Sequence, residues 1–378
     1  MSPIPFHRPY MTGKELWYIS QAQQTGSLAG NGPYTKRCHH WLEEKIGVSK
    51  ALLTHSCTAA LEMAAILSNV KPGDEVILPS YTFVSTANAF VLQGAIPVFV
   101  DIRPDTLNIN EALVEDAITD RTRAIVPVHY AGVACEMDTL QEIAQRYCLL
   151  LIEDAAQAIM SRYKGKFLGS IGDLGCFSFH ETKNISSGEG GAILINTTSF
   201  EERSEIIREK GTNRSKFFRG ETDKYTWVDK GSSYLPGEIT AASLYAQLEE
   251  VEQITAMRMK IWNQYDQLLQ PLEQSGELRR PIVPSYCEHN AHMYYILVEN
   301  LSTQVSLISY LKNRDISAAY PYVPLHRSPA GKQYGRFQGE LHQTDRLSLL
   351  RLPLFPTLTS AQLEFIVDIL YEFFGKNR

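Results

Sequence analysis

One lysine of this chain stands where it could attack an aldehyde or a ketone. The apolar run 175–179 predicts a buried strand, and Lys183 follows it in a polar loop that ends in glycines. A Schiff base requires an amine that is deprotonated part of the time, and burial at a strand end lowers the pKa of a lysine toward that state. Taken alone, a lysine in such a loop is more typical of a solvated surface, so its chemistry depends on its neighbours.

A pair of carboxylates ends the buried strand that comes before. Residues 149–152 are continuously apolar, as in a strand covered on both faces, and Glu153 and Asp154 follow them. Open α/β sheets bind ligands at the carboxyl ends of their strands, so a carboxylate here is predicted to face a ligand. Residues 155–158 could begin a helix, and capping of that helix is the alternative role for one of the two acids.

A serine, a cysteine and a threonine open an apolar helical pattern after the strand 51–54. The free backbone N–H groups at the start of a helix bind an anion without a basic side chain, and Ser56, Cys57 and Thr58 occupy that start. A plain capping turn is the commoner role of such a segment.

A basic loop follows later in an otherwise acidic chain. The loop spans residues 210–220, and its candidate phosphate-binding cations are Arg214, Lys216 and Arg219, with Phe217 and Phe218 among them. Arginine forks bind phosphate oxygens and a phenyl ring stacks on a base, so the loop is a candidate for a phosphate-bearing substrate. A solvated loop often has the same composition.

Strands and helices must alternate to position these groups. The predicted α/β domain has strands at 51–54, 75–78, 96–101, 123–128, 149–154 and 192–195, with helices at 33–46, 57–67, 137–147 and 200–210. Residues 1–35 show no clear element. A helix over 238–269, a strand at 293–298 and helices at 305–313 and 360–374 predict a smaller C-terminal α/β domain. We expect the large domain to span 1–254 and the small domain 255–378.

Composition excludes several classes of protein. The chain has 378 residues, is 44% hydrophobic and carries a formal net charge of -6, so no overall positive field attracts nucleic acid or an anionic membrane. The six cysteines are scattered, and adjacent side chains such as those of 38–40 diverge on a helix, so we expect no metal site. Without a leader sequence or an apolar run of membrane-spanning length, a cytoplasmic location is expected.

These motifs together resemble the DegT/DnrJ/EryC1/StrS family of sugar aminotransferases. The resemblance covers essentially the whole chain, including the runs 79–83, 153–157 and 188–191 and the spacing from Ser178 to Lys183. It implies fold type I, with a mostly parallel sheet covered by helices and a smaller C-terminal domain, and it implies pyridoxal 5′-phosphate (PLP) as cofactor.

The resemblance also assigns roles to residues. It implies that Lys183 carries the cofactor covalently and moves the proton during transfer, while Asp154 pairs with the pyridine nitrogen. Further cofactor contacts are implied for the backbone of Cys57 and Thr58, for Phe83 on the ring face, and for the side chains of Gln157 and Ser178.

One position departs from the family pattern. Most relatives carry Gly-x-Asn-x-Arg where this chain has residues 231–235, Gly-Ser-Ser-Tyr-Leu. In the family that Asn reaches the cofactor phosphate of the partner subunit, so here Ser233 makes this contact or the contact is lost. A homodimer with shared active sites is thereby implied.

The resemblance implies a nucleotide-sugar acceptor and L-glutamate as donor. Subgroup features at 126–138, 178–184, 209–215 and 231–235 point to amination at C4 of dTDP-4-dehydro-6-deoxyglucose. Candidate substrate contacts are Arg214, Lys216, Arg219, Tyr322 and His326, with a core or interface role as the alternative for Tyr322.

Other functions remain open at this point. A related enzyme could form the C4 epimer or aminate C3 on the same scaffold. A pyridoxamine-dependent sugar dehydratase is another possibility. Relatives of that kind carry histidine in place of the Schiff-base lysine, whereas this chain has Lys183. A non-catalytic binding or regulatory protein could keep the fold, although Lys183, Asp154, Phe83 and Ser178 are all present.

Overall fold

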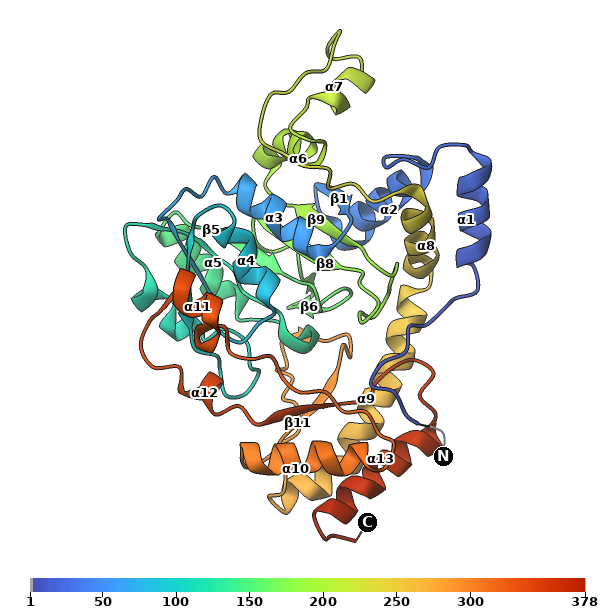
Figure 1. Cartoon of the computed structure of the whole chain (residues 1–378), viewed down its shortest axis with the longest axis vertical. Coiled ribbons are helices and arrows are strands. Elements are labelled where there is room, and N and C mark those ends of the chain that lie inside the picture. The colour runs from blue at the N-terminus through green and yellow to red at the C-terminus, as the bar shows by residue number, and fades with distance from the viewer. Residues whose placement is uncertain (1–2, 378) are drawn as a thin grey trace.

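A single large sheet organises the computed structural model, which describes residues 3–377 (Figure 1). Every neighbouring pair in the sheet is parallel except those of β9, which runs antiparallel to β1 and β8. In order across the sheet, the strands are β1 (Lys50–Thr54), β9 (Gly191–Ile195), β8 (Leu174–Ser178), β5 (Leu150–Asp154), β4 (Thr122–Ile125), β2 (Glu75–Pro79), β3 (Ile96–Val100) and β12 (Arg336–Phe337).

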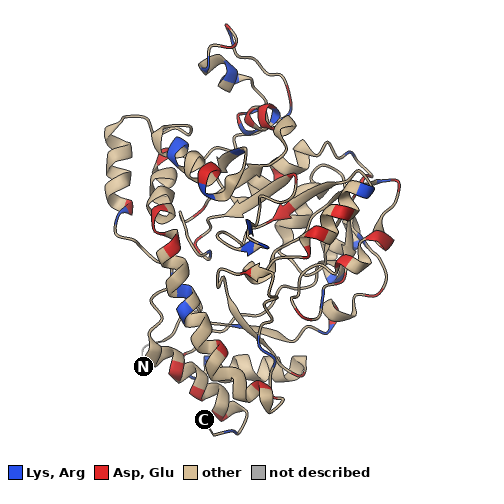
Figure 2. Ribbon diagram, turned by 180° about the vertical axis from the view of Figure 1, so that it is seen from behind, with Lys and Arg blue, Asp and Glu red and all other residues tan. Residues whose placement is uncertain are grey.

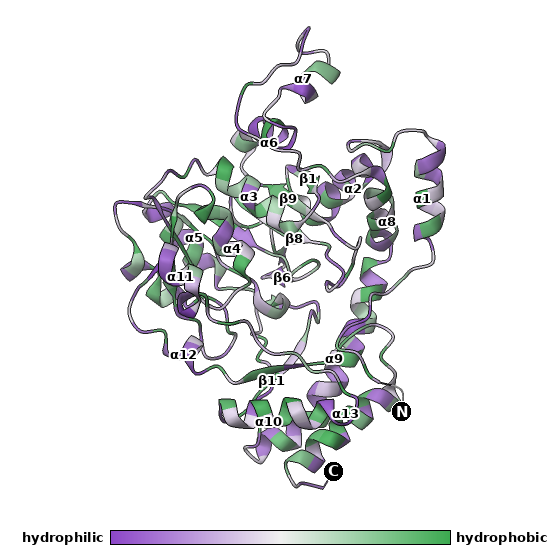
Figure 3. Ribbon diagram, viewed as in Figure 1, coloured by the Kyte–Doolittle hydropathy of each residue, from purple (hydrophilic) through white to green (hydrophobic). Residues whose placement is uncertain are grey.

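Helices cover both faces of this sheet, because alternate strand residues enter two separate cores. In β5, for example, Leu151 packs in one core and Ile152 in the other. In Figure 3 the central strands are mostly green, the colour of hydrophobic residues. One face is covered by α2 (Pro33–Leu42), α5 (Met137–Arg146) and α8 (Glu238–Glu249), and the other by α3 (Cys57–Leu67), α4 (Val84–Val91) and α6 (Glu201–Arg208).

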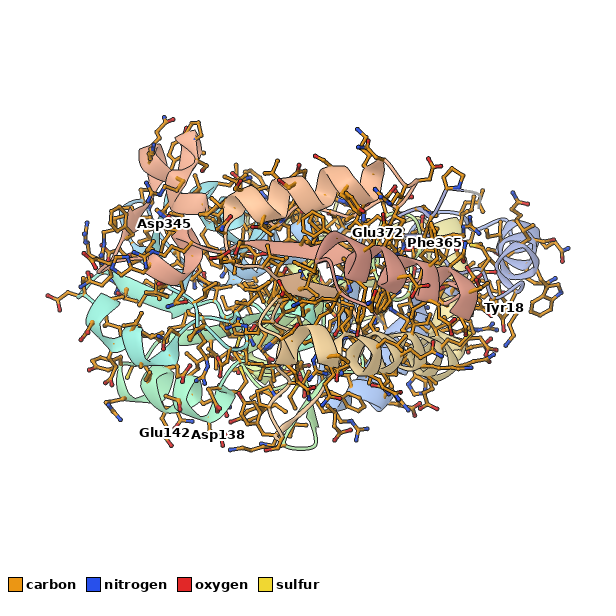
Figure 4. All side chains as sticks on the ribbon, turned by 90° about the horizontal axis from the view of Figure 1, so that it is seen from below. Tyr18, Asp138, Glu142, Asp345, Phe365 and Glu372 are labelled. Atoms are coloured by element: carbon orange, nitrogen blue, oxygen red, sulfur yellow. The ribbon has the colours of Figure 1, made fainter. Side chains whose placement is uncertain are left out.

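A second, smaller body lies below the sheet in Figure 1 and has its own core. The long helix α9 leads into it, and α10 and α13 lie in front when the molecule is seen from below (Figure 4). Its elements are α9 (Val251–Gln274), β11 (Tyr294–Leu297), α10 (Leu301–Lys312), β13 (Leu349–Leu352) and α13 (Ser360–Phe373). Short elements complete the fold: β6 (Arg162–Tyr163), β7 (Lys166–Phe167), β10 (Cys287–Glu288), α11 (Pro329–Tyr334) and α12 (His342–Asp345).

No single position in the sequence divides the described chain, residues 3–377, into the two bodies. α9 runs without interruption through residue 255, where the sequence suggested a boundary. Ile4 packs in the small core, and Arg336 of β12 pairs with Val98 of β3 in the large sheet. The chain therefore crosses between the bodies at its N-terminal end and again after α10, and the boundary at 254/255 stays a prediction.

Three local predictions were wrong. A helix, α1 (Glu15–Gln24), lies within the N-terminal segment, where no element was expected. The helix expected over 238–269 is two helices, because Glu250 leaves helical geometry at φ -108° and ψ 8°. No helix follows β5, since residues 155–160 form turns, so neither carboxylate there caps a helix.

The segment from 209 to 235 projects from the top of the molecule in Figure 1 and carries the short helix α7 (Arg214–Phe218). Figure 2 shows both signs of charge on this part of the chain. Within residues 3–377, no helix has the length and apolar character needed to cross a membrane.

Candidate active site

A cavity of about 520 Å³ opens where the carboxyl ends of β5 and β8 face the small body. Its volume suits a cofactor together with a small substrate. Of the predicted site residues, it brings together eight, from both bodies: Cys57, Thr58, Phe83, Asp154, Gln157, Ser178, Lys183 and Tyr322.

The loop after β8 holds Lys183 in place. The backbone N–H of Lys183 donates to the carbonyl of His180 at 2.9 Å. The next residue, Asn184, is buried and donates through Nδ2 to the carbonyl of Asn290 at 2.8 Å. Ile185 is fully buried in the large core. These anchors fix the backbone on both sides of the lysine, while its side chain reaches the cavity.

Burial lowers the pKa of Lys183, although the negative charge of Asp154 opposes that shift. The nearby positive charge of Arg351 adds to the lowering. A lysine with a lowered pKa is deprotonated over more of the neutral range, which a Schiff-base nucleophile requires.

Asp154 is held in one orientation by two donors. Thr86 donates through Oγ1 to Asp154 Oδ2 at 2.7 Å, and the N–H of Ala156 donates to Oδ1 at 3.1 Å. Thr82 lies 2.9 Å from Thr86, hydroxyl to hydroxyl. The carboxylate is only 5% exposed and lines the cavity, so it can pair with a cationic group bound there.

The start of α3 forms one end of the cavity. The N-cap residue Ser56 accepts the N–H of Ala59 through Oγ, which leaves the N–H groups of Cys57 and Thr58 without an intrahelical partner. A methyl group on Gly191 would lie 2.5 Å from the nitrogen of Cys57. The glycine thus lets β9 approach the helix start, which has the geometry of an anion site.

Gln157 and Tyr322 connect the large body to the small-body side of the cavity. The Oε1 of Gln157 accepts the N–H of Ala131 at 2.7 Å, and its Nε2 donates to the hydroxyl of Tyr322 at 3.2 Å. The ring of Phe83 is 6.0 Å from that of Tyr322, centroid to centroid, and Phe83 is 55% exposed. A flat ligand ring therefore has an available aromatic face at Phe83.

The other predicted contacts do not line the cavity of their own chain. Ser233 is exposed, and its backbone pairs with that of Glu209 on the projecting segment. The three cations of the segment that were predicted to bind substrate are paired with carboxylates of the same chain: Arg214 with Glu209 at 3.9 Å, Lys216 with Glu202 at 2.6 Å, and Arg219 with Glu205 at 2.9 Å and Glu221 at 2.6 Å. These three side chains therefore offer less free positive charge than the sequence predicts.

His326 is occupied by internal contacts. Its Nδ1 lies 2.6 Å from Ser80 Oγ and its Nε2 lies 3.0 Å from Asp345 Oδ1, and the residue is 8% exposed. It lies outside the cavity lining, so the proposed contact with a sugar has no geometric support in this chain.

Sequence reasoning missed several residues of the cavity. Thr86 was within reach of prediction, since it follows Phe83 by nearly one helical turn and so shares its face. Arg351 on β13 and Phe6 near the N-terminus had no such signal. Arg351 and Phe6 reach the cavity only because segments far apart in the sequence pack against one another.

The sequence model of the DegT/DnrJ/EryC1/StrS aminotransferase family matches residues 9–371. The chain belongs to this family. It is 31% identical to the spore coat polysaccharide biosynthesis protein SpsC of Bacillus subtilis, over 97% of this chain and 95% of SpsC.

Solved structures share the whole fold. The aminotransferase TlmJ from Streptoalloteichus hindustanus is 28% identical with a TM-score of 0.90, over 98% of this chain and 99% of TlmJ. Spr1654 from Streptococcus pneumoniae in its PLP form is 26% identical with a TM-score of 0.90, over 98% of each chain. The fold is therefore that of the fold-type I PLP enzymes, as the sequence predicted, and the protein is a PLP-dependent sugar aminotransferase.

The cavity fits this cofactor. Unpaired N–H groups at the start of α3, with the glycine that makes room for them, suit a phosphate. The oriented carboxylate of Asp154 suits a protonated pyridine nitrogen, and Lys183 lines the same cavity. These groups come from the carboxyl ends of adjacent strands and from one helix start, which is where open α/β sheets bind ligands.

Proposed function

We propose that the protein transfers an amino group from L-glutamate to C4 of dTDP-4-dehydro-6-deoxy-D-glucose. The products are dTDP-4-amino-4,6-dideoxy-D-galactose and 2-oxoglutarate. The protein would then be the dTDP-4-amino-4,6-dideoxygalactose transaminase of enterobacterial common antigen biosynthesis. The observation that carries the transaminase part is that Lys183 and Asp154 line one cavity from adjacent strands.

The residues of this chain have separate tasks in the proposed reaction. When bound, PLP withdraws electrons from the carbon that carries the transferred amine. Asp154 holds a proton on the ring nitrogen through its oriented carboxylate. Lys183 would hold the cofactor and would move the proton onto and off the amine-bearing carbon of the substrate. The aromatic face of Phe83 and the amide of Gln157 orient the ring, while Thr58, the N–H of Cys57 and the Ser178 hydroxyl hold the phosphate.

The sugar acceptor is proposed from the sequence stretches that resemble one subgroup of the family, namely 126–138, 178–184, 209–215 and 231–235. Among these, 178–184 forms the end of β8 and the lysine loop, and 231–235 forms the base of the projecting segment. The proposed sugar contact at Tyr322 is compatible with the position of that residue on the cavity.

A homodimer is part of the proposal. Phe218 and Trp227 on the projecting segment are 69% and 79% exposed, so the segment offers apolar area for contact with another subunit. Because Ser233, Arg214, Lys216 and Arg219 lie away from the cavity of their own chain, their proposed contacts with cofactor and diphosphate require the cavity of a partner subunit.

The test is incubation of the protein with dTDP-4-dehydro-6-deoxyglucose and L-glutamate, followed by NMR of the amino sugar. The proposal predicts an amine at C4 in the axial orientation. An equatorial amine would assign the protein to the C4 epimer, and an amine at C3 would contradict the regiochemistry. Absence of any amino sugar with either glutamate or glutamine as donor would remove the nucleotide-sugar assignment.

A further inference from the structure

A histidine that the proposed reaction does not use lines the cavity beside the lysine loop. His292 lies just before β11, and its Nδ1 is 2.8 Å from Oδ1 of Asn184, the residue that follows Lys183. The amide nitrogen of Asn184 donates to the carbonyl of Asn290, so the amide oxygen is the atom that faces the ring. Because an amide oxygen only accepts, Nδ1 of His292 carries the ring proton.

The other ring nitrogen of His292 is a free acceptor. With the proton on Nδ1, Nε2 holds a lone pair. Nε2 has no hydrogen-bond partner among residues 3–377 and is not one of the enclosed polar atoms without a partner in that range, so it is open to the cavity. Burial, together with the positive charges of Lys183 and Arg258, holds the pKa of His292 well below its usual value. The ring is therefore neutral at neutral pH, and Nε2 is available to a donor on a ligand.

The turn before β11 fixes the position of this ring. Asn290 is fully buried and donates through Nδ2 to two carbonyls of the turn after β5, at 2.9 and 2.8 Å. Ala291 takes the left-handed conformation, with φ 51°, which residues with a Cβ rarely adopt. The buried guanidinium of Arg258 donates to the carbonyls of Ala291 at 3.0 Å and of His292 at 2.7 Å, and its Nη1 is buried without a partner among residues 3–377. A buried arginine and a strained residue both cost stability, and strained residues cluster at functional sites.

The chemistry of the substrate identifies the donor. Phosphate, carboxylate and ketone oxygens only accept, so they cannot bond Nε2. Because His292 is tied to the residue after Lys183, Nε2 lies near the lysine, where the carbon that receives the amine must be. In the proposed acceptor this carbon is C4. Of its two neighbours, C5 carries a methyl group and no hydroxyl, whereas C3 carries a hydroxyl.

We propose that Nε2 of His292 accepts a hydrogen bond from the C3 hydroxyl of the acceptor sugar and thereby places C4 at the Lys183 position. This inference rests on the proposed acceptor. It makes His292 a specificity-determining residue, because a hexose without a hydroxyl beside its ketone leaves Nε2 without a partner in the cavity.

The test compares the binding of two sugars to the holoenzyme. Reduction with borohydride first makes the holoenzyme unreactive, so that calorimetry gives the dissociation constants of dTDP-4-dehydro-6-deoxyglucose and of its analogue without the C3 hydroxyl. His292→Asn keeps an N–H for Asn184 at the Nδ1 position but has no acceptor at the Nε2 position. It is expected to weaken binding of the sugar about 5- to 10-fold and to leave binding of the analogue within about twofold of wild type.

A second substitution separates recognition of the hydroxyl from support of the turn. His292→Gln places an amide oxygen at the Nε2 position but loses the bond to Asn184, and it is expected to bind the sugar more tightly than His292→Asn does. A purely structural role predicts the opposite order. The matched control is His289→Asn on the same loop, outside the cavity lining, where Nδ1 of His289 accepts the N–H of Ala291 at 3.2 Å. The amide oxygen of asparagine can accept the same N–H, so this variant is expected to bind both sugars as wild type does.

Three results would overturn the inference. The first is equal binding of the two sugars by wild type, and the second is an equal loss for both sugars in His292→Asn. The third is a slower change of cofactor absorbance with L-glutamate in unreduced His292→Asn, which would assign Nε2 to the amine. Failure of the proposed function looks different, because wild type itself would then bind neither sugar, and the assignment of the C3 hydroxyl would fail with it.

Discussion

At the scale of single residues, the proposed chemistry depends on Lys183, whose pKa is lowered by burial. Lys183→Ala is expected to bind PLP without a covalent bond and to lose at least about 10³-fold in kcat, because the proton then has no carrier. Absorbance spectra and steady-state turnover measure the two effects. Lys164→Ala is the control, since Lys164 pairs with Asp138 at the surface and is expected to leave both unchanged. Turnover of Lys183→Ala near that of wild type would contradict the assigned role.

The pH dependence of cofactor capture follows from the same residue. Burial lowers the pKa of Lys183, so its amine loses the proton at a lower pH than a free lysine, whose pKa is about 10.4. The rate at which apoprotein captures PLP is therefore expected to rise with pH and to level off below that value. Stopped-flow absorbance measures the profile. A profile that still rises at the pKa of free lysine would contradict the burial of this amine.

Thr86 is expected to act through Asp154. Thr86→Val removes the donor 2.7 Å from Asp154 Oδ2 and is expected to lower kcat about tenfold, because the carboxylate loses its orientation. Thr303→Val on α10 is a control, since the Thr303 hydroxyl donates to Oδ1 of the N-cap residue Asn300 at 3.2 Å, on the small body. If Thr86→Val had the same kcat as wild type, the turn after β5 would be sufficient to orient the Asp154 carboxylate without the Thr86 hydroxyl.

At the scale of elements, the contact between β9 and α3 shapes the end of the cavity that is proposed to hold the cofactor phosphate. A methyl group at Gly191 would lie 2.4 Å from the carbonyl carbon of Ser56. Gly191→Ala is thus expected to destabilise the fold by about 1–3 kcal/mol and to weaken PLP binding, because the helix start must move. Chemical denaturation and cofactor titration measure the two effects.

Gly237→Ala serves as the matched control for that substitution. The added methyl group there would meet only the carbonyl oxygen of Leu28, at an ordinary distance of 3.4 Å. Because Gly237 is the N-cap residue of α8, where alanine is less favourable than glycine, the substitution is expected to cost about 1 kcal/mol in stability and to leave PLP binding unchanged. If Gly191→Ala were equally mild, close packing at the helix start would not be required.

Many of the helices and strands could be predicted from the sequence. The strands were predictable because continuous apolar runs between turns mark a buried parallel sheet, and adjacent strand ends then bring Asp154 and Lys183 together. The break at Glu250 carried no glycine or proline to signal it. Arg351 could not be predicted either, since a single arginine on a short strand reaches the cavity only through the packing of the small body.

At the scale of the whole molecule, assembly decides whether the projecting segment has a function. The double substitution Phe218→Ser and Trp227→Ser is expected to weaken the dimer and to lower activity together, because two exposed aromatic side chains lose their apolar contact area. Sedimentation across a concentration series measures the assembly. Leu301→Ser on α10 is the control, since Leu301 is also exposed, at 53%, but lies on the small body.

A monomeric wild type with full activity would contradict the shared site. A dimer unaffected by the double substitution would place the interface on another surface. In either case the proposed contacts of Ser233 with cofactor and of the three paired cations with the diphosphate would no longer have a structural basis.

The proposed activity of the whole molecule depends on a covalent bond between the cofactor and one side chain. Its most direct measurement is reduction of the PLP-loaded protein with borohydride, followed by digestion and mass spectrometry of the peptides. The expected result is loss of the visible absorbance band, with the mass of reduced PLP on the peptide that contains Lys183 and on no other. Label on a different lysine, or a protein that stays unlabelled after saturation with PLP, would contradict the central claim.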